Sequence, residues 1–161
     1  MKFRPADSSD LSSIVDINLR SIFETYSSYY SEKDLRQWIG DRSEKNFEKS
    51  LSERQLFVVE DDKRITGFLD VIPGEVLAVY VYPEEERKGY GRMLLLEGID
   101  RAKQKDKKVV VYASLNAVSF YEKYEFEIKK EVKHSRHGID LPLIKMNLNT
   151  NSNKMVGGNS E

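Results

Sequence analysis

The sequence of 161 residues contains no cysteine. This absence excludes disulfide bonds, thiolate metal ligands and cysteine nucleophiles, and it is compatible with a reducing compartment. Long apolar runs are missing too: no stretch approaches the roughly 18 residues that a membrane-spanning helix needs. The first ten residues also lack the apolar core of a secretory signal. We therefore expect a cytoplasmic protein that does not act in a membrane.

An excess of charge of either sign is also missing, because 26 Lys and Arg residues nearly balance 27 Asp and Glu residues. Such a chain gives no reason to expect nucleic acid or a membrane surface as the main partner. Histidine is scarce, and His134 and His137 flank Arg136 in a polar stretch without a nearby carboxylate cluster. A metal site needs several convergent ligands. We therefore expect no metal centre, and we expect both histidines to lie in a solvated loop.

The sequence does contain one continuous alternation of strand and helix patterns, which predicts a single domain over residues 1–148. The remaining residues, 149–161, are rich in Asn, Ser and Gly and are expected to be disordered. Strands are expected at 2–5, 126–133 and 140–148.

The segment between the first strand and residue 55 has helix-capping residues. Asp7 is expected to cap a helix that ends near Tyr26, and Ser31 and Ser43 are expected to cap two further helices. An aromatic cluster in this segment has two interpretations, either the lining of a substrate cleft or ordinary packing. Its members are Tyr26, Tyr29, Tyr30 and Trp38.

Three antiparallel strands in direct succession are predicted between residues 55 and 82, with a turn at Pro73-Gly74 before the third. The helix after them has its apolar residues at helical spacing, from Gly91 to Ala102. The apolar run at 107–114 is then typical of a buried strand, parallel to its predecessor.

The stretch with the clearest functional pattern is residues 75–96, EVLAVYVYPEEERKGYGRMLLL. It predicts a strand, a turn containing Gly89 and Gly91, and the start of a helix. The first N–H groups of a helix lack intrahelical partners and lie at the positive end of the helix dipole. An anion is therefore the natural ligand of this loop. Positive charge around it comes from Arg87, Lys88 and Arg92.

Dinucleotide-binding and P-loop proteins also carry glycines after strands. This loop, however, lacks Gly-x-Gly-x-x-Gly and Gly-Lys-Ser/Thr, and it follows the fourth predicted strand instead of the first. A nucleotide site is therefore the weaker interpretation.

Two motifs, together with the order of the predicted elements, resemble the GNAT superfamily of N-acetyltransferases. Residues 86–91, ERKGYG, are similar to the family's Gln/Arg-x-x-Gly-x-Gly/Ala, whose backbone amides hold the pyrophosphate of acetyl-coenzyme A. Residues 113–126, ASLNAVSFYEKYEF, resemble its Asn-containing turn followed by Phe-Tyr-Glu-Lys-x-Gly-Phe. The resemblance covers residues 1–148. It implies the GNAT fold, an α/β (α+β) fold in which a central, mixed, mostly antiparallel twisted sheet of about seven strands is flanked by about four to five helices.

The resemblance also implies that acetyl-coenzyme A is a cosubstrate. The residues expected to bind it are Tyr80, Val81, Arg87, Lys88, Gly89, Tyr90, Gly91, Arg92, Asn116 and Tyr121. Asn116 has a second interpretation as the N-cap of a short helix. Glu86 departs from the pattern, and we expect it to turn outward while Arg87 supplies the missing positive charge. Glu125 stands where the family often has glycine.

Acetyl transfer to a primary amine needs a base, because an alkylammonium with a pKa of about 10.4 is almost fully protonated at neutral pH. The resemblance makes Glu75 the candidate, since histone-acetylating members carry a glutamate at the same offset, fourteen residues before Gly89. It makes Tyr121 the candidate acid beside the coenzyme sulfur. Each has a plainer interpretation: Glu75 as a solvated turn residue and Tyr121 as a packed aromatic.

The function implied is transfer of an acetyl group from acetyl-coenzyme A to a primary amine of a small molecule, polyamine or protein. Direct attack in a ternary complex is expected, because no cysteine exists to form an acyl-enzyme. The acceptor is expected between residues 20–40 and 134–139, over the junction of the fourth and fifth strands. An acidic lining from Glu24, Glu32 or Asp34 would favour a polyamine or a lysine side chain.

A non-catalytic acyl-coenzyme A sensor or partner module is the alternative. A homodimer is compatible with the sequence.

Overall fold

The computed structural model describes residues 1–104 and 108–149. The strands are β1 (Lys2–Pro5), β2 (Leu56–Asp61), β3 (Arg64–Ile72), β4 (Glu75–Val81), β5 (Val110–Ala113), β6 (Phe126–Arg136) and β7 (Ile139–Leu148). The helices are α1 (Leu11–Thr25), α2 (Glu32–Ile39), α3 (Lys45–Ser52), α4 (Tyr90–Ala102) and α5 (Val118–Glu122). Three short 3-10 turns are η1 (Ser8–Asp10), η2 (Pro83–Glu85) and η3 (Leu115–Ala117).

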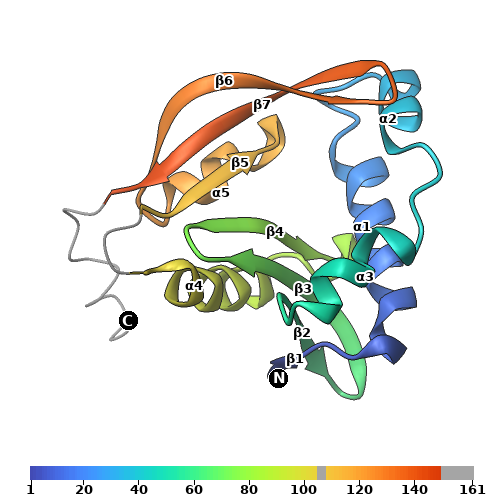
Figure 1. The fold of residues 1–161 in the computed structure, drawn as a ribbon, viewed down its shortest axis with the longest axis vertical. Helices are drawn as coiled ribbons and strands as arrows, with labels where there is room; N and C mark the ends of the chain where they lie inside the picture. Colours follow the sequence, from blue (N-terminus) through green and yellow to red (C-terminus); the bar gives the residue numbers. More distant parts are fainter. Residues whose placement is uncertain (105–107, 150–161) are drawn as a thin grey trace.

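The described residues form one seven-stranded sheet with the strand order β1-β2-β3-β4-β5-β7-β6 (Figure 1). Every neighbouring pair is antiparallel except β4 and β5, which are parallel. With its five helices, this is the fold class that the sequence predicts. The expected disordered tail lies outside the described residues except for Asn149, whose N–H donates to the Glu125 carbonyl at 2.8 Å. No helix within the described ranges has the length and apolarity needed to cross a bilayer.

The N-terminal helices begin largely as their capping residues predict. Asp7 and Asp10 form a reciprocal capping box at η1, and the Ser31 side chain caps α2. The prediction for Ser43 is wrong, because its side chain makes no cap. Its backbone N–H instead donates to the Asn46 side chain at 2.7 Å, just before α3.

The two faces of the sheet carry different cores. On β3, Phe68 packs with residues of α1 and α3, whereas its neighbour Leu69 packs with residues of α4. Both are fully buried, and each such burial is worth about 1.5–3 kcal/mol. Gly98 lets α4 approach closely, because a Cβ there would lie 2.8 Å from a Leu69 methyl group. The sheet is therefore held rigidly between helices on both sides.

β4 and β5 pair at only one position, Glu75 opposite Val110. The β3–β4 register shifts by one residue between the pairs Asp70–Ala78 and Val71–Val76, so Leu77 is the extra residue of a bulge on β4. Beyond this point the two parallel strands diverge (Figure 1). Because of this divergence, the edge of β4 that faces β5 is largely unpaired, and the sheet is split at its centre.

β6 and β7 form a long hairpin that reaches past the sheet to α2 (Figure 1). The predicted loop around His134 and Arg136 is wrong, because β6 continues to Arg136 and pairs residue by residue with β7. The hairpin turns at His137 and Gly138, both with positive φ. Cross-strand pairing with β7 therefore keeps the polar stretch around His134 in a strand that contacts α2.

Candidate active site

Two cavities lie on either side of the divergence between β4 and β5. The α4 cavity, of about 520 Å³, is lined by the start of α4 and by η3 and α5. The hairpin cavity, of about 790 Å³, is lined by the β6–β7 hairpin, α2 and the residues that follow α2. The cavities share six lining residues: Tyr26, Leu77, Ala78, Tyr80, Tyr112 and Ser114. Molecules bound in the two cavities would therefore meet at the split in the sheet.

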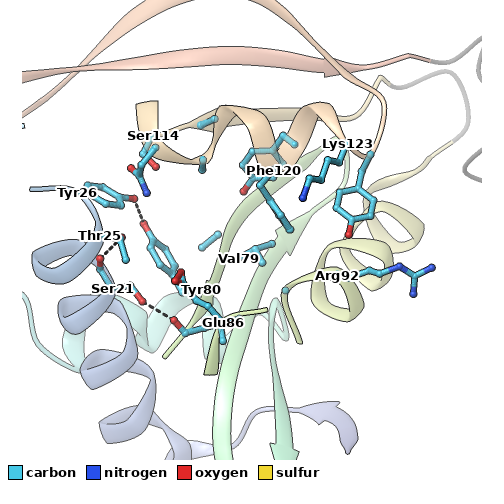
Figure 2. A pocket seen from close by; sticks show the side chains of 18 of the residues that line it. Ser21, Thr25, Tyr26, Val79, Tyr80, Glu86, Arg92, Ser114, Phe120 and Lys123 are labelled. Atoms are coloured by element: carbon cyan, nitrogen blue, oxygen red, sulfur yellow. Dashed lines mark hydrogen bonds between the residues drawn. The ribbon is translucent and has the colours of Figure 1, made fainter. Parts of the chain in front are cut away.

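The α4 cavity contains the loop that the sequence predicts to bind an anion. Gly89 has φ +93°, a left-handed conformation that favours glycine, and a Cβ there would meet no protein atom within 4 Å. Gly91 also lines the cavity, and a Cβ there would lie 3.6 Å from the Phe120 ring. Arg87 and Arg92 belong to the same lining, and Figure 2 shows Arg92. An open space, a helix N-terminus and two guanidinium groups are thus brought together.

Two of the residues predicted for this loop direct their side chains elsewhere. Lys88 pairs with Glu85, with Nζ 3.3 Å from Oε1, and neither residue is part of the cavity lining. The buried Tyr90 donates its hydroxyl to Asp61 at 2.6 Å. Lys123, which directly follows α5, also lines the cavity, although no sequence motif pointed to it (Figure 2).

Glu86 is the residue that we expect to turn outward from the anion-binding loop. It is exposed, yet it contributes to the wall of the α4 cavity (Figure 2). Its carboxylate would be unfavourable beside a phosphate. Arg87 and Arg92 supply positive charge in the same lining.

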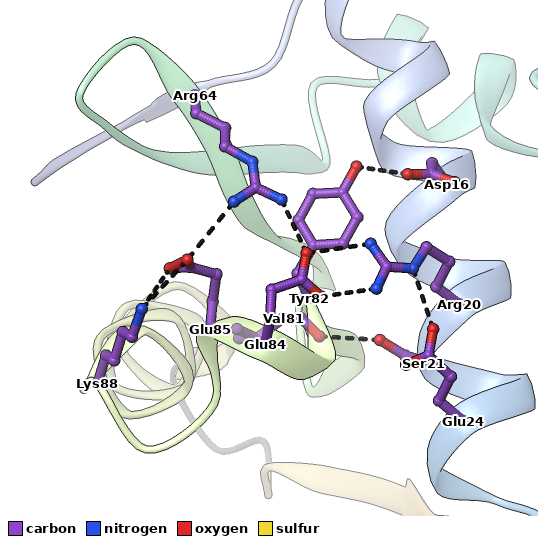
Figure 3. Close-up of polar contacts among 10 residues, drawn as sticks. All are labelled: Asp16, Arg20, Ser21, Glu24, Arg64, Val81, Tyr82, Glu84, Glu85 and Lys88. Atoms are coloured by element: carbon purple, nitrogen blue, oxygen red, sulfur yellow. Dashed lines mark hydrogen bonds and ion pairs between the residues drawn. The ribbon is translucent and has the colours of Figure 1, made fainter.

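The turn before α4 is braced against α1 and β3 by an ion-pair network (Figure 3). Arg20 of α1 contacts both carboxylate oxygens of Glu84, at 2.7 and 3.0 Å, and Arg64 reaches the same carboxylate at 2.9 Å. Between them, Tyr82 donates its hydroxyl to Asp16 at 2.7 Å. Single exposed pairs contribute little to stability, but a shared carboxylate fixes geometry. The network holds the chain that leads into the anion-binding loop.

Asn116 and Tyr121 both line the α4 cavity. The Asn116 side-chain oxygen is buried and has no hydrogen-bond partner among the described residues. Its interpretation as a helix cap is wrong, because Ser114 and Ala117 occupy the N-cap positions of η3 and α5. Tyr121 is buried, and burial raises the pKa of its phenol well above the usual value. Its hydroxyl therefore stays protonated and is a weak acid.

In the aromatic cluster, some residues line a cavity and others pack against the fold, which are the two roles that the sequence leaves open. Tyr26 and Trp38 line cavities, and the hydroxyls of Tyr26 and Tyr80 lie 2.8 Å apart at the boundary between them. Tyr30 has a packing role, since it donates to the Pro142 carbonyl at 2.7 Å. Tyr29 is exposed.

Two carboxylates from adjacent strands line the hairpin cavity. Glu75 is half-buried at the closed end of the split, and burial, with a smaller effect of Asp70, raises its pKa. Asp70 lies on β3, opposite Ala78 of β4, and is only 8% exposed. One of its oxygens accepts from Ser50 at 2.8 Å, the other is buried without a partner among the described residues, and burial raises its pKa to about 6.

Sequence analysis did not identify Asp70. The only available signal was an acidic residue inside the apolar strand ITGFLDVI.

The acidic residues expected near the acceptor do not line either cavity. Glu24 pairs with Arg20 at 3.0 Å and Glu32 with Arg36 at 3.5 Å, both on exposed surfaces. His134, expected in a solvated loop, is instead half-buried against Trp38, and burial together with Arg136 and Arg42 lowers its pKa. Within the described ranges, no three potential metal ligands gather.

Comparison with known proteins places this geometry in a family. The family model described as acetyltransferase (GNAT) domain matches residues 26–149. YafP of Escherichia coli (strain K12), an uncharacterized N-acetyltransferase, is 26% identical over 129 residues, which span 80% of this chain and 81% of YafP.

Solved structures show the same fold. A GCN5-related N-acetyltransferase from Rhodopseudomonas palustris has a TM-score of 0.83 at 24% identity, covering 91% of this chain and 94% of that one. The PaiA N-acetyltransferase from Thermoplasma acidophilum, in complex with coenzyme A, has a TM-score of 0.72 at 25% identity, covering 91% and 97%. The matched domain spans most of the sequence, and the protein therefore belongs to the GNAT acetyltransferase family.

Proposed function

We propose that the protein transfers an acetyl group from acetyl-coenzyme A to a primary amine by direct attack within a ternary complex. The observation that carries this proposal is the meeting of two cavities at the β4–β5 split, with Tyr80, Tyr112 and Ser114 common to both. A coenzyme in one cavity and an acceptor in the other would have their reacting groups side by side. Such positioning accounts for much of the rate in group transfer between two bound substrates.

The residues of the α4 cavity fit acetyl-coenzyme A. The N-terminus of α4, with Gly89, Arg87 and Arg92, suits a pyrophosphate. The unpartnered oxygen of Asn116 suits an amide N–H of the pantetheine arm. Coenzyme A in the Thermoplasma acidophilum relative supports the assignment. When bound, acetyl-coenzyme A supplies the activated acetyl group, and Tyr80 and Val81 of β4 lie along the cavity wall.

The hairpin cavity supplies the proton acceptors. An incoming ammonium must lose a proton before it can attack, and carboxylates with raised pKa values accept protons better than ordinary ones. Glu75 is the base that the family resemblance suggests, and its place in the hairpin cavity supports this role. Asp70 shares the role, because one of its oxygens has no partner in the described part of the chain and its pKa is about 6.

Tyr121 lies in the α4 cavity, where it would donate a proton to the departing thiolate. A thiol has a pKa of about 8.5, lower than the value of about 10 for an ordinary tyrosine phenol. Burial weakens the Tyr121 acid further. Its contribution to the rate is therefore secondary.

Thermal-shift measurements with coenzyme A, ATP and NAD, followed by assays on a panel of primary amines, test this function. Binding to the folded state raises the melting temperature, and we expect a rise with coenzyme A only. A rise with ATP or NAD but none with coenzyme A would contradict the proposal. Binding of coenzyme A without turnover of any amine would instead favour a non-catalytic acyl-coenzyme A module.

A further inference from the structure

The hairpin cavity holds two arginines that have no acidic partner among the described residues. Arg42, in the segment after α2, and Arg136, at the end of β6, both lie over the Trp38 ring, at 5.1 and 4.7 Å from its centroid. Arg42 donates to the Asn18 side chain at 2.9 Å, and Arg136 donates to His134 at 3.4 Å. Within residues 1–104 and 108–149, no carboxylate oxygen lies within 4.0 Å of either guanidinium.

Burial disfavours the positive charge of both arginines, and Arg136 also repels that of Arg42. The pKa of Arg42 is lowered by burial and then by Arg136, and the pKa of Arg136 is lowered by burial although the residue keeps an exposed surface. Arginines elsewhere in the protein, such as Arg4 and Arg20, have carboxylate partners and raised pKa values. A partly buried guanidinium such as that of Arg42 normally has such a partner. Uncompensated charge in a cavity therefore points to a ligand of opposite sign.

The platform that presents the two guanidinium groups is rigid. Trp38 is 6% exposed, and its indole N–H donates to the His134 carbonyl at 3.1 Å. Gln37 donates to the His137 carbonyl at 2.9 Å. At Gly40 the chain lies so close to the hairpin that a Cβ would be 2.5 Å from the His137 ring. The arginines therefore lie on two segments, the β6–β7 hairpin and the residues after α2, that are joined by close contacts and hydrogen bonds.

Charge is separated within the hairpin cavity. Asp70 and Glu75 come from the sheet, whereas Arg42, Arg136 and a third cation, Lys133, come from the hairpin and from the segment after α2. The remaining acidic lining residue, Asp41, is exposed and makes no ion pair with either arginine within 4.0 Å. A ligand with one cationic and one anionic end matches this arrangement.

We propose that the acceptor is a small molecule that carries an anionic group in addition to its primary amine. Arg42 and Arg136 bind the anionic group, and the amine lies toward Asp70 and Glu75. A carboxylate and a phosphate share this chemistry, since both offer oxygens that guanidinium groups bind. The cavity volume of about 790 Å³ is within the usual range of small-molecule sites. A polyamine would bring a second positive charge to the arginines and is disfavoured.

This inference rests on the proposed acetyl transfer, and matched acceptors test it separately. Amino acids are each compared with their carboxamides, and phosphoethanolamine with ethanolamine, at saturating acetyl-coenzyme A. We expect at least about a tenfold higher kcat/KM for the anionic member of the favoured pair, the effect of charge-assisted hydrogen bonds. The favoured pair identifies the anion as carboxylate or phosphate.

Substitutions test whether the preference for anionic acceptors depends on the arginines of the hairpin cavity. We expect Arg136→Gln to remove most of the preference by raising KM for the anionic acceptor far more than KM for its neutral counterpart, while KM for acetyl-coenzyme A stays unchanged. Arg36→Gln is the matched control, because Arg36 also lies over an aromatic ring, that of Phe23, but lines neither cavity. The inference would be overturned if the wild-type protein turned over every neutral acceptor as well as or better than its anionic counterpart. It would also be overturned if Arg136→Gln lost equal activity on both members of a pair.

If no amine is acetylated, calorimetric titration of the coenzyme A complex with the same pairs decides the question. Tighter binding of an anionic member, lost in Arg136→Gln, supports the anion site even though the proposed activity has failed. Equal binding of both members, or no binding of either, overturns it.

Discussion

The two cavities that meet at the β4–β5 split are built in different ways. The α4 cavity draws its anion site from one short stretch, residues 86–92, and relies on backbone N–H groups at a helix start. The hairpin cavity brings together Arg42, Asp70 and Arg136 from three elements far apart in the sequence. Backbone recognition needs a particular loop and leaves a local motif. Side-chain recognition depends on tertiary packing, and we expect it to set the choice of acceptor.

The largest effect is expected at the carboxylates of the hairpin cavity. Asp70→Asn and Glu75→Gln remove proton acceptors, and loss of a general base typically lowers the rate by about 10²-fold or more. Steady-state kcat for an acetylated amine measures the change. Asp100→Asn, on the exposed surface of α4, is the control. If both cavity variants kept the wild-type kcat, the assignment of the base would be wrong.

Asp70→Asn should also change the pH dependence of stability. Because the folded protein holds the Asp70 proton more tightly than the unfolded chain, the contribution of Asp70 to wild-type stability falls as pH rises from about 4 to about 6 and levels off at higher pH. The shift of about two pKa units corresponds to about 3 kcal/mol. In Asp70→Asn this part of the pH dependence disappears, so the variant gains stability relative to wild type as pH rises. Urea unfolding at pH 4 and pH 8 checks this, and equal pH profiles would refute it.

A smaller, one-sided effect is expected at the start of α4. In Gly89→Ala the left-handed backbone is strained by about 1–2 kcal/mol, and the new methyl group occupies the space where the coenzyme phosphate would lie. We expect about a tenfold loss of coenzyme A affinity in calorimetry, without a change in preference between acceptors. Gly138→Ala carries a similar strain at φ +82° outside both cavities and should leave this affinity unchanged. Equal losses in both variants would assign the effect to general destabilisation.

The smallest effect is expected at Tyr121. Because burial makes its phenol a weak acid, Tyr121→Phe should slow acetyl transfer by less than about tenfold. Tyr124→Phe removes a hydroxyl from the same cavity lining and serves as the control. Complete loss of activity in Tyr121→Phe, with coenzyme binding intact, would show that proton donation is essential.

The sequence predicts the α4 cavity better than the hairpin cavity for physical reasons. Gly89 and the capped helices depend on local backbone conformation, which neighbouring residues determine. The extent of β6 depends on pairing with β7, so His134 and Arg136 in a polar stretch were wrongly predicted to lie in a loop. Asp70 lies beside the bulge of β4 at Leu77, and the sequence carries no local pattern for that bulge.

Initial-rate kinetics test the central proposal most directly. Both acetyl-coenzyme A and a turned-over amine are varied, and double-reciprocal plots are drawn at several fixed concentrations of the second substrate. Transfer within a ternary complex, with the two substrates meeting at the β4–β5 split, predicts lines that intersect. Parallel lines, the pattern of a covalent acetyl-enzyme intermediate, would contradict direct attack.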